Sequence, residues 1–212
     1  MTLNNKLKIG ALGCIVLSVF AQFVADFHGL VSMYQNTISI PPNIYLIIGF
    51  VGEPILIFSI LMISIGFWGA WEKYNIKLAR TLSITFVIYS LERCFWAFAD
   101  INFALTLQKY GASHENIQFA GMLLGISALV AGITAGIVIS SQMALFFYKL
   151  KNRLGFNACI LIISSMIIGI FSKIMTMYTL PLILTVVFLL SMGGKSIGLG
   201  LVGISLYQLS KE

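Results

Sequence analysis

The chain has 212 residues, of which 59% are hydrophobic and 9% are charged, whereas a soluble domain carries about 25% charged residues. This composition excludes an ordinary soluble globular protein, and no alternating pattern of about ten residues suggests a membrane β-barrel. The net charge of +6 is distributed between apolar segments instead of forming one patch, so it does not predict nucleic-acid binding.

Six apolar stretches are long enough to span a bilayer, which takes about 20 helical residues. We predict an all-α, polytopic transmembrane helix bundle in one domain, residues 1–212. Its spans are expected at about 8–29, 44–70, 79–107, 118–147, 155–177 and 180–207. The first stretch follows lysines, as in a signal peptide, but it is long and no cleavage pattern clearly follows it. We therefore expect a retained helix.

The basic residues between the spans alternate from side to side. One side has only Lys109 and Lys173, and the other has nine: Lys6, Lys8, Lys73, Lys77, Arg80, Lys149, Lys151, Arg153 and Lys211. Because cytoplasmic loops are rich in Lys and Arg, the pattern predicts that both termini are cytoplasmic. We expect a multi-pass protein of a bacterial cytoplasmic membrane.

Four ionisable residues fall near the middle of their spans: Glu53, Glu92, Arg93 and Lys195. A charge at the bilayer centre costs roughly 3 kcal/mol, so we expect them to face the bundle interior and to pair. Glu92 and Arg93 are adjacent and point about 100° apart, so their partners must come from other helices. Depth favours the pairs Arg93–Glu53 and Lys195–Glu92. The alternative pairs Lys195 with Glu53.

Two of these residues stand beside helix-breaking residues. Glu53 lies in "GFVGEP", where Pro54 is expected to kink the helix. Lys195 lies in "SMGGKSIGLG", where glycines are expected to loosen the helix. Such interruptions within apolar spans are typical of transporter sites. The alternative is that the proline only kinks and the glycines only pack.

A second polar layer lies at the outer end of the spans. Asp26, His28 and Asp100 belong to it, and Trp96 shares a helix face with Glu92 because it follows by four residues. We interpret these four residues as candidates for an outer vestibule that attracts cations or shares protons. The alternative for Asp26 and His28 is a satisfied interfacial pair. Two ligands do not make a metal site, so we predict no metal and no cofactor.

Small residues mark the fourth predicted span. Gly121 and Gly125, and likewise Gly132 and Gly136, are spaced by four residues, which lets two helix backbones approach closely. Plain helix packing is the simplest interpretation of these glycines.

The functional hypothesis is transport of a small solute or ion, coupled to protons. Six helices make a small transporter, so a homodimer or a membrane partner subunit is expected beside the lipid bilayer. No nucleophile–base arrangement and no HExxH motif appears, so no catalytic residue is predicted. The alternatives are a non-catalytic accessory subunit, in which buried pairs only set helix register, and a lipid- or quinone-binding protein.

Two stretches, "FWGAWEKYNIKLARTLSITFVIYSLE" and "FFYKLKNRLGFNACILIISSMIIGI", resemble a family of uncharacterised bacterial membrane proteins with six predicted helices (a domain of unknown function). The resemblance covers about a third of the chain. It implies the six-helix topology and a glutamate at about the place of Glu92. Arg93 and Lys195 are not part of the family pattern, and the resemblance implies no biochemical activity.

Overall fold

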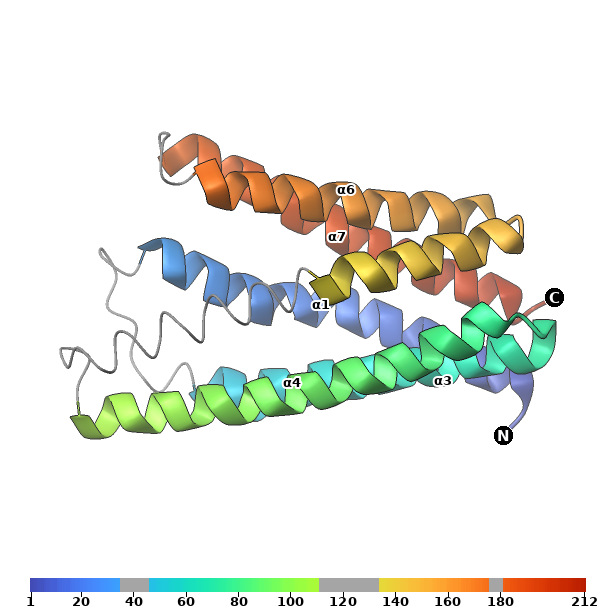
Figure 1. Ribbon diagram of the computed structural model, residues 1–212, viewed down its shortest axis with the longest axis horizontal. Coiled ribbons are helices and arrows are strands. Elements are labelled where there is room, and N and C mark those ends of the chain that lie inside the picture. The colour runs from blue at the N-terminus through green and yellow to red at the C-terminus, as the bar shows by residue number, and fades with distance from the viewer. Residues whose placement is uncertain (35–45, 111–133, 176–180) are drawn as a thin grey trace.

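Figure 1 shows the computed structural model of the chain, a bundle of long helices that run side by side. The structure describes residues 1–34, 46–110, 134–175 and 181–212. They form α1 (Leu3–Tyr34), the π-helical segment η1 (Ile48–Gly52), α3 (Glu53–Tyr74), α4 (Lys77–Tyr110), a helix over residues 134–149, α6 (Arg153–Met175) and α7 (Pro181–Leu209). These described residues contain helices and no strand, which confirms the predicted all-α class.

Five helices of the described part are long and apolar enough to cross a membrane. Their apolar windows are Leu3–Phe20, Phe50–Tyr74, Lys77–Thr106, Arg153–Phe171 and Leu189–Leu209. They correspond to the first, second, third, fifth and sixth predicted spans. Of the predicted fourth span, only residues 134–147 lie in the described part, where they are helical. The count of six spans stays a prediction.

Large apolar side chains cover the outside of the helices. Val19, Phe58, Phe98 and Leu190 are each more than 60% exposed. Exposed apolar surface of this kind marks contact with a membrane or another apolar partner. The surface is therefore compatible with a membrane-embedded protein.

The two termini lie at the same end of the bundle, together with the turns at residues 75–76 and 150–152 (Figure 1). Side chains link these segments, since Lys6 forms an ion pair with Glu72 at 2.6 Å and Lys73 donates to the carbonyl oxygen of Leu209 at 2.8 Å. We call this end of the molecule the basic end, because the nine basic residues of the predicted cytoplasmic side belong to its segments.

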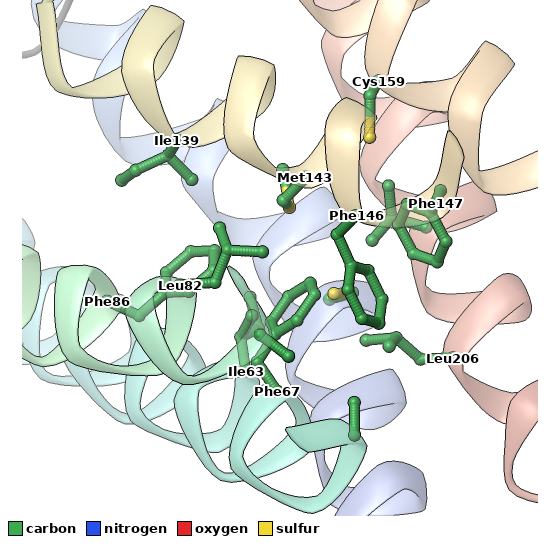
Figure 2. Close-up of a cluster of buried hydrophobic side chains, with 14 of the residues drawn as sticks. Ile63, Phe67, Leu82, Phe86, Ile139, Met143, Phe146, Phe147, Cys159 and Leu206 are labelled. Carbon is green, nitrogen blue, oxygen red and sulfur yellow. The ribbon is translucent and has the colours of Figure 1, made fainter. Parts of the chain in front are cut away.

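An aromatic core joins α3, α4 and the helix over residues 134–149. Phe67 stacks on Phe86 with ring centroids 5.7 Å apart and meets Phe146 edge to face at 5.3 Å. Figure 2 shows this cluster together with Leu82 and Met143. Aromatic pairs in these geometries add to the packing energy of a helix bundle.

The helices α1 and α3 approach through glycine. A Cβ atom added at Gly10 would lie 2.5 Å from the Cα atom of Gly66, and the same distance separates a Cβ at Gly66 from Gly10. Real Cβ atoms do not come so close to backbone, so neither position accepts a side chain in this arrangement. Small residues therefore set the distance between these two helices.

The glycines around Lys195 do not interrupt α7, which is helical from Pro181 to Leu209. Gly194 faces Ser165 of α6, and Gly198 faces Ala158 and Ile162 of the same helix. The structure thus agrees with the packing alternative for these two residues. Gly136 also packs, against Met166 of α6, whereas Gly121, Gly125 and Gly132 lie outside the described residues.

Candidate functional site

Glu53 is a fully buried carboxylate at the point where the backbone changes from π-helix to α-helix. Its exposure is 0%, η1 ends at Gly52, and α3 begins at Glu53 with Pro54 in its first turn. The chain is helical without a break from residue 46 to Tyr74, and Pro54 has no N–H to donate to the preceding turn, which fits the irregular hydrogen bonding there. A π-helical segment directly precedes Glu53, and such segments frequently accompany functional sites, whereas the kink expected at Pro54 stays a prediction.

Arg93 of α4 binds the carboxylate of Glu53. Its Nε donates to Oε2 at 3.1 Å, and a terminal nitrogen donates to Oε1. The two parallel bonds use the planar fork of the guanidinium, which gives the strongest and most directional ion pairs. The Arg93–Glu53 pair was predicted from the sequence, and it is present in the structure.

The pair is embedded in the apolar part of its helices. Glu53 lies 18 residues from Trp71 and Arg93 lies 13 residues from Arg80, or about 27 Å and 20 Å along the helix axes. The hydrocarbon layer is about 30 Å thick. The pair therefore lies in the half of the bundle remote from the basic end, with Glu53 farther out than the predicted midplane.

Glu92 does not use Lys195 as its partner. Its Oε1 accepts a hydrogen bond from Nε1 of Trp96, one turn later on α4, at 3.2 Å. The amino group of Lys195 instead lies 3.7 Å from the place where a Cβ of Gly169 on α6 would stand. The physical reason is the packing order, because α4 packs on α3 whereas α7 packs on α1 and α6. Depth alone cannot reveal that order.

Tyr89 is a member of the site that sequence reasoning missed. It is half-buried, lies one turn before Arg93, and is within electrostatic range of Glu53, Glu92 and Arg93. The spacing of four residues from Arg93 on one helix face was the available signal. The phenol supplies a further polar group beside the ion pair of Glu53 and Arg93.

The predicted outer vestibule is described only in part. Asp26 and His28 fall on α1 and Asp100 falls on α4, but the side chains of all three lie outside the described part of the structure. Their role stays a prediction. Trp96 donates to Glu92, and its place in a vestibule also stays a prediction. Among the described residues, no group of three or more His, Cys, Asp or Glu side chains could hold a metal ion.

This arrangement is capable of proton-dependent anion binding. With Glu53 ionised, the carboxylate occupies the guanidinium fork of Arg93. With Glu53 protonated, the carboxyl group loses most of its attraction for Arg93, and the fork becomes available to a carboxylate or phosphate from outside the chain.

Comparison of the chain with protein families, with curated proteins and with solved structures found no match. The resemblance to the six-helix family stays a prediction.

Proposed function

We propose that this chain is a multi-pass protein of a bacterial cytoplasmic membrane, with six spans and both termini in the cytoplasm. The basic end supports the orientation, since the termini and two turns share it with nine Lys and Arg residues. Arg80 also lies 5.3 Å over the ring of Trp71 there, as expected of an aromatic belt at a membrane interface. A cysteine in place of the exposed Asn75 should react with an impermeant thiol reagent only from the cytoplasmic side.

We propose further that the protein transports a small anionic solute together with a proton, and that Glu53 and Arg93 form the binding site. The fully buried carboxylate in the fork of Arg93, directly after a π-helical segment, is the observation that carries this proposal. An ion pair in an apolar environment adds little to stability. The presence of this pair within two apolar helices therefore favours a functional role for Glu53 and Arg93 over a purely stabilising one.

The transport step follows from competition for Arg93. A proton adds to the Glu53 carboxylate, the ion pair separates, and the guanidinium binds the anionic group of the solute. Loss of the proton restores the carboxylate, which displaces the solute. One proton and one negative charge thus move together, so the loaded site carries the same net charge as the empty site.

Thiol labelling tests whether water reaches the pair. In a background with Cys14, Cys94 and Cys159 replaced by alanine, one variant carries Ala97→Cys, one turn from Arg93 and half-buried. Its matched control carries Phe98→Cys, at the same depth but 69% exposed on the apolar surface. Transport predicts that a charged thiol reagent labels position 97 and leaves position 98 unlabelled.

Proton flux tests the coupling. Vesicles with an entrapped pH-sensitive dye receive wild-type protein, the double variant Glu53→Gln/Arg93→Gln, or the control Glu72→Gln at the basic end. With inorganic phosphate supplied as the anionic probe on the side of lower pH, an imposed pH gradient should collapse faster with wild type and the control than with the double variant. A double variant with wild-type flux would exclude these residues as the coupling site.

A second candidate function is that of an accessory subunit. The observation in its favour is that Glu53 and Arg93 neutralise each other across α3 and α4, as a pair that only sets helix register would do. This function predicts that neither position 97 nor position 98 is labelled and that a partner remains bound in mild detergent.

A further inference from the structure

Two apolar grooves of similar size lie on the surface of the described part. One has a volume of about 290 Å³ between α1 and α7 and is lined by Lys8, Ala11, Leu12, Ile15, Gly203, Ile204 and Tyr207. The other has about 330 Å³ between α3 and α4 and is lined by Ser64, Ile65, Trp68, Ser83, Ile84, Val87 and Ile88. Only the α1–α7 groove has a basic residue in its lining.

The charge of the α1–α7 groove is located at its mouth. Lys8 is exposed and, within the described ranges, has no ion-pair partner. Lys6, two residues earlier, points to the other side of α1 and binds Glu72. Lys211 adds a second cation, with its amino group 4.7 Å from the centre of the Tyr207 ring. Lys8 and Tyr207 thus line the groove where it meets the basic end, and Lys211 lies against the ring of Tyr207.

The apolar lining continues inward from this mouth. Leu12 and Ile15 follow Lys8 by four and seven residues, so they share its face of α1 and lie about 6 and 10 Å deeper. Ile204 lies one turn inward from Tyr207 on α7. A cationic mouth followed by an apolar groove between two long apolar helices matches the shape and polarity of an anionic phospholipid.

We propose that the α1–α7 groove binds one anionic phospholipid of the surrounding bilayer. Its phosphate lies between Lys8 and Lys211 with the hydroxyl of Tyr207 as a donor, and one acyl chain packs along Leu12, Ile15 and Ile204. This site is separate from Glu53 and Arg93 and does not depend on the transport proposal. The α3–α4 groove, which has no cation in its lining, takes acyl chains without a preference for the headgroup.

Photolabelling in vesicles tests the proposal. The 212-residue chain is placed in phosphatidylcholine vesicles that contain a trace of either phosphatidylglycerol or phosphatidylcholine with a photoreactive acyl chain. We expect the phosphatidylglycerol probe to label the groove segments of α1 and α7 well above the phosphatidylcholine probe. Lys8→Gln and Lys211→Gln should each lower that labelling roughly fivefold.

Two controls keep the outcome clear. Lys77→Gln removes an exposed lysine at the same end of the bundle but on α4, so labelling should not change. The α3–α4 groove should be labelled equally by both probes. Equal labelling of the α1–α7 groove by both probes would overturn the anionic preference. No labelling of the α1–α7 groove by either probe would overturn the site itself.

Discussion

Helix α3 is held by two different interfaces, and they use opposite chemistry. Against α1, the contact is backbone on backbone, at Gly10 and Gly66. Against α4, the contact includes buried polar bonds. Ser64 Oγ donates to the carbonyl oxygen of Ser83 at 2.8 Å, and Arg93 forms an ion pair with Glu53. In the described part, the ion pair of the first interface, Lys6–Glu72, lies near the surface at the basic end, whereas the polar bonds of the second interface involve the buried Glu53, Ser64 and Ser83.

This difference suggests at which of its two interfaces α3 changes position relative to its neighbour. In lipid, helices gain no hydrophobic energy from associating, so close packing and interhelical hydrogen bonds must hold them together. Close packing of two glycines admits one geometry. A carboxylate–guanidinium pair can exchange its partner for a proton and an anion. We therefore expect conformational change at α3–α4 and a rigid α1–α3 unit.

The largest effect is expected from breaking the ion pair. Glu53→Gln removes the negative charge that Arg93 binds across α3 and α4 and should lower the stability by about 3 kcal/mol, the lower part of the usual range because the Arg93 side chain is 21% exposed. The double variant Glu53→Gln/Arg93→Gln should recover most of the loss. Thermal melting in detergent measures both. If the single variant were as stable as wild type, the pair would contribute nothing to the α3–α4 interface.

The next effect tests the rigid interface. Gly66→Ala forces a methyl group against the backbone of Gly10 and should lower stability by about 1–3 kcal/mol through overpacking. Gly200→Ala on α7 is the matched control, because an added Cβ there meets nothing within 4 Å. Unfolding titrations of the two variants check the difference. A Gly66→Ala protein as stable as Gly200→Ala would refute the close approach of α1 and α3.

A smaller effect is expected at the serine contact. Ser64→Ala removes the donor to Ser83 and should lower stability by about 0.6 kcal/mol, the average for an interhelical hydrogen bond in a membrane protein. Ser59→Ala is a suitable comparison, since Ser59 is also buried on α3 but bonds only the carbonyl oxygen of Ile55 in its own helix. A loss at Ser64 that does not exceed the loss at Ser59 would mean that the interhelical bond adds nothing.

The smallest effect is expected at the basic end. Lys6→Gln breaks the ion pair with Glu72, whose carboxylate lies at the surface, where water and salt screen the attraction. The melting temperature should change by less than the difference between repeated measurements, both at low and at high salt. A clear loss at low salt alone would indicate that the charges at this end do stabilise the bundle.

The positions of the long apolar helices could be predicted from the sequence, because each helix coincides with an apolar stretch that is visible in the sequence. The Glu53–Arg93 pair was also predictable, since both residues lie in neighbouring apolar helices and each charge needs a partner. The partner of Lys195 was not predictable. Its amino group faces α6 because α7 packs there, and packing order is a property of the assembled bundle.

The close contact of Gly10 with Gly66 shows the same limit. Both glycines are visible in the sequence, but so are Gly193 and Gly200, where an added Cβ atom would meet nothing within 4 Å. Composition and periodicity thus determined that this chain forms apolar helices and where its basic residues gather, because those properties depend on residues near one another in the sequence. Only the tertiary structure decided which glycines touch, which charges pair and which groove receives Lys8, because those outcomes depend on how each helix is rotated and which neighbour it meets.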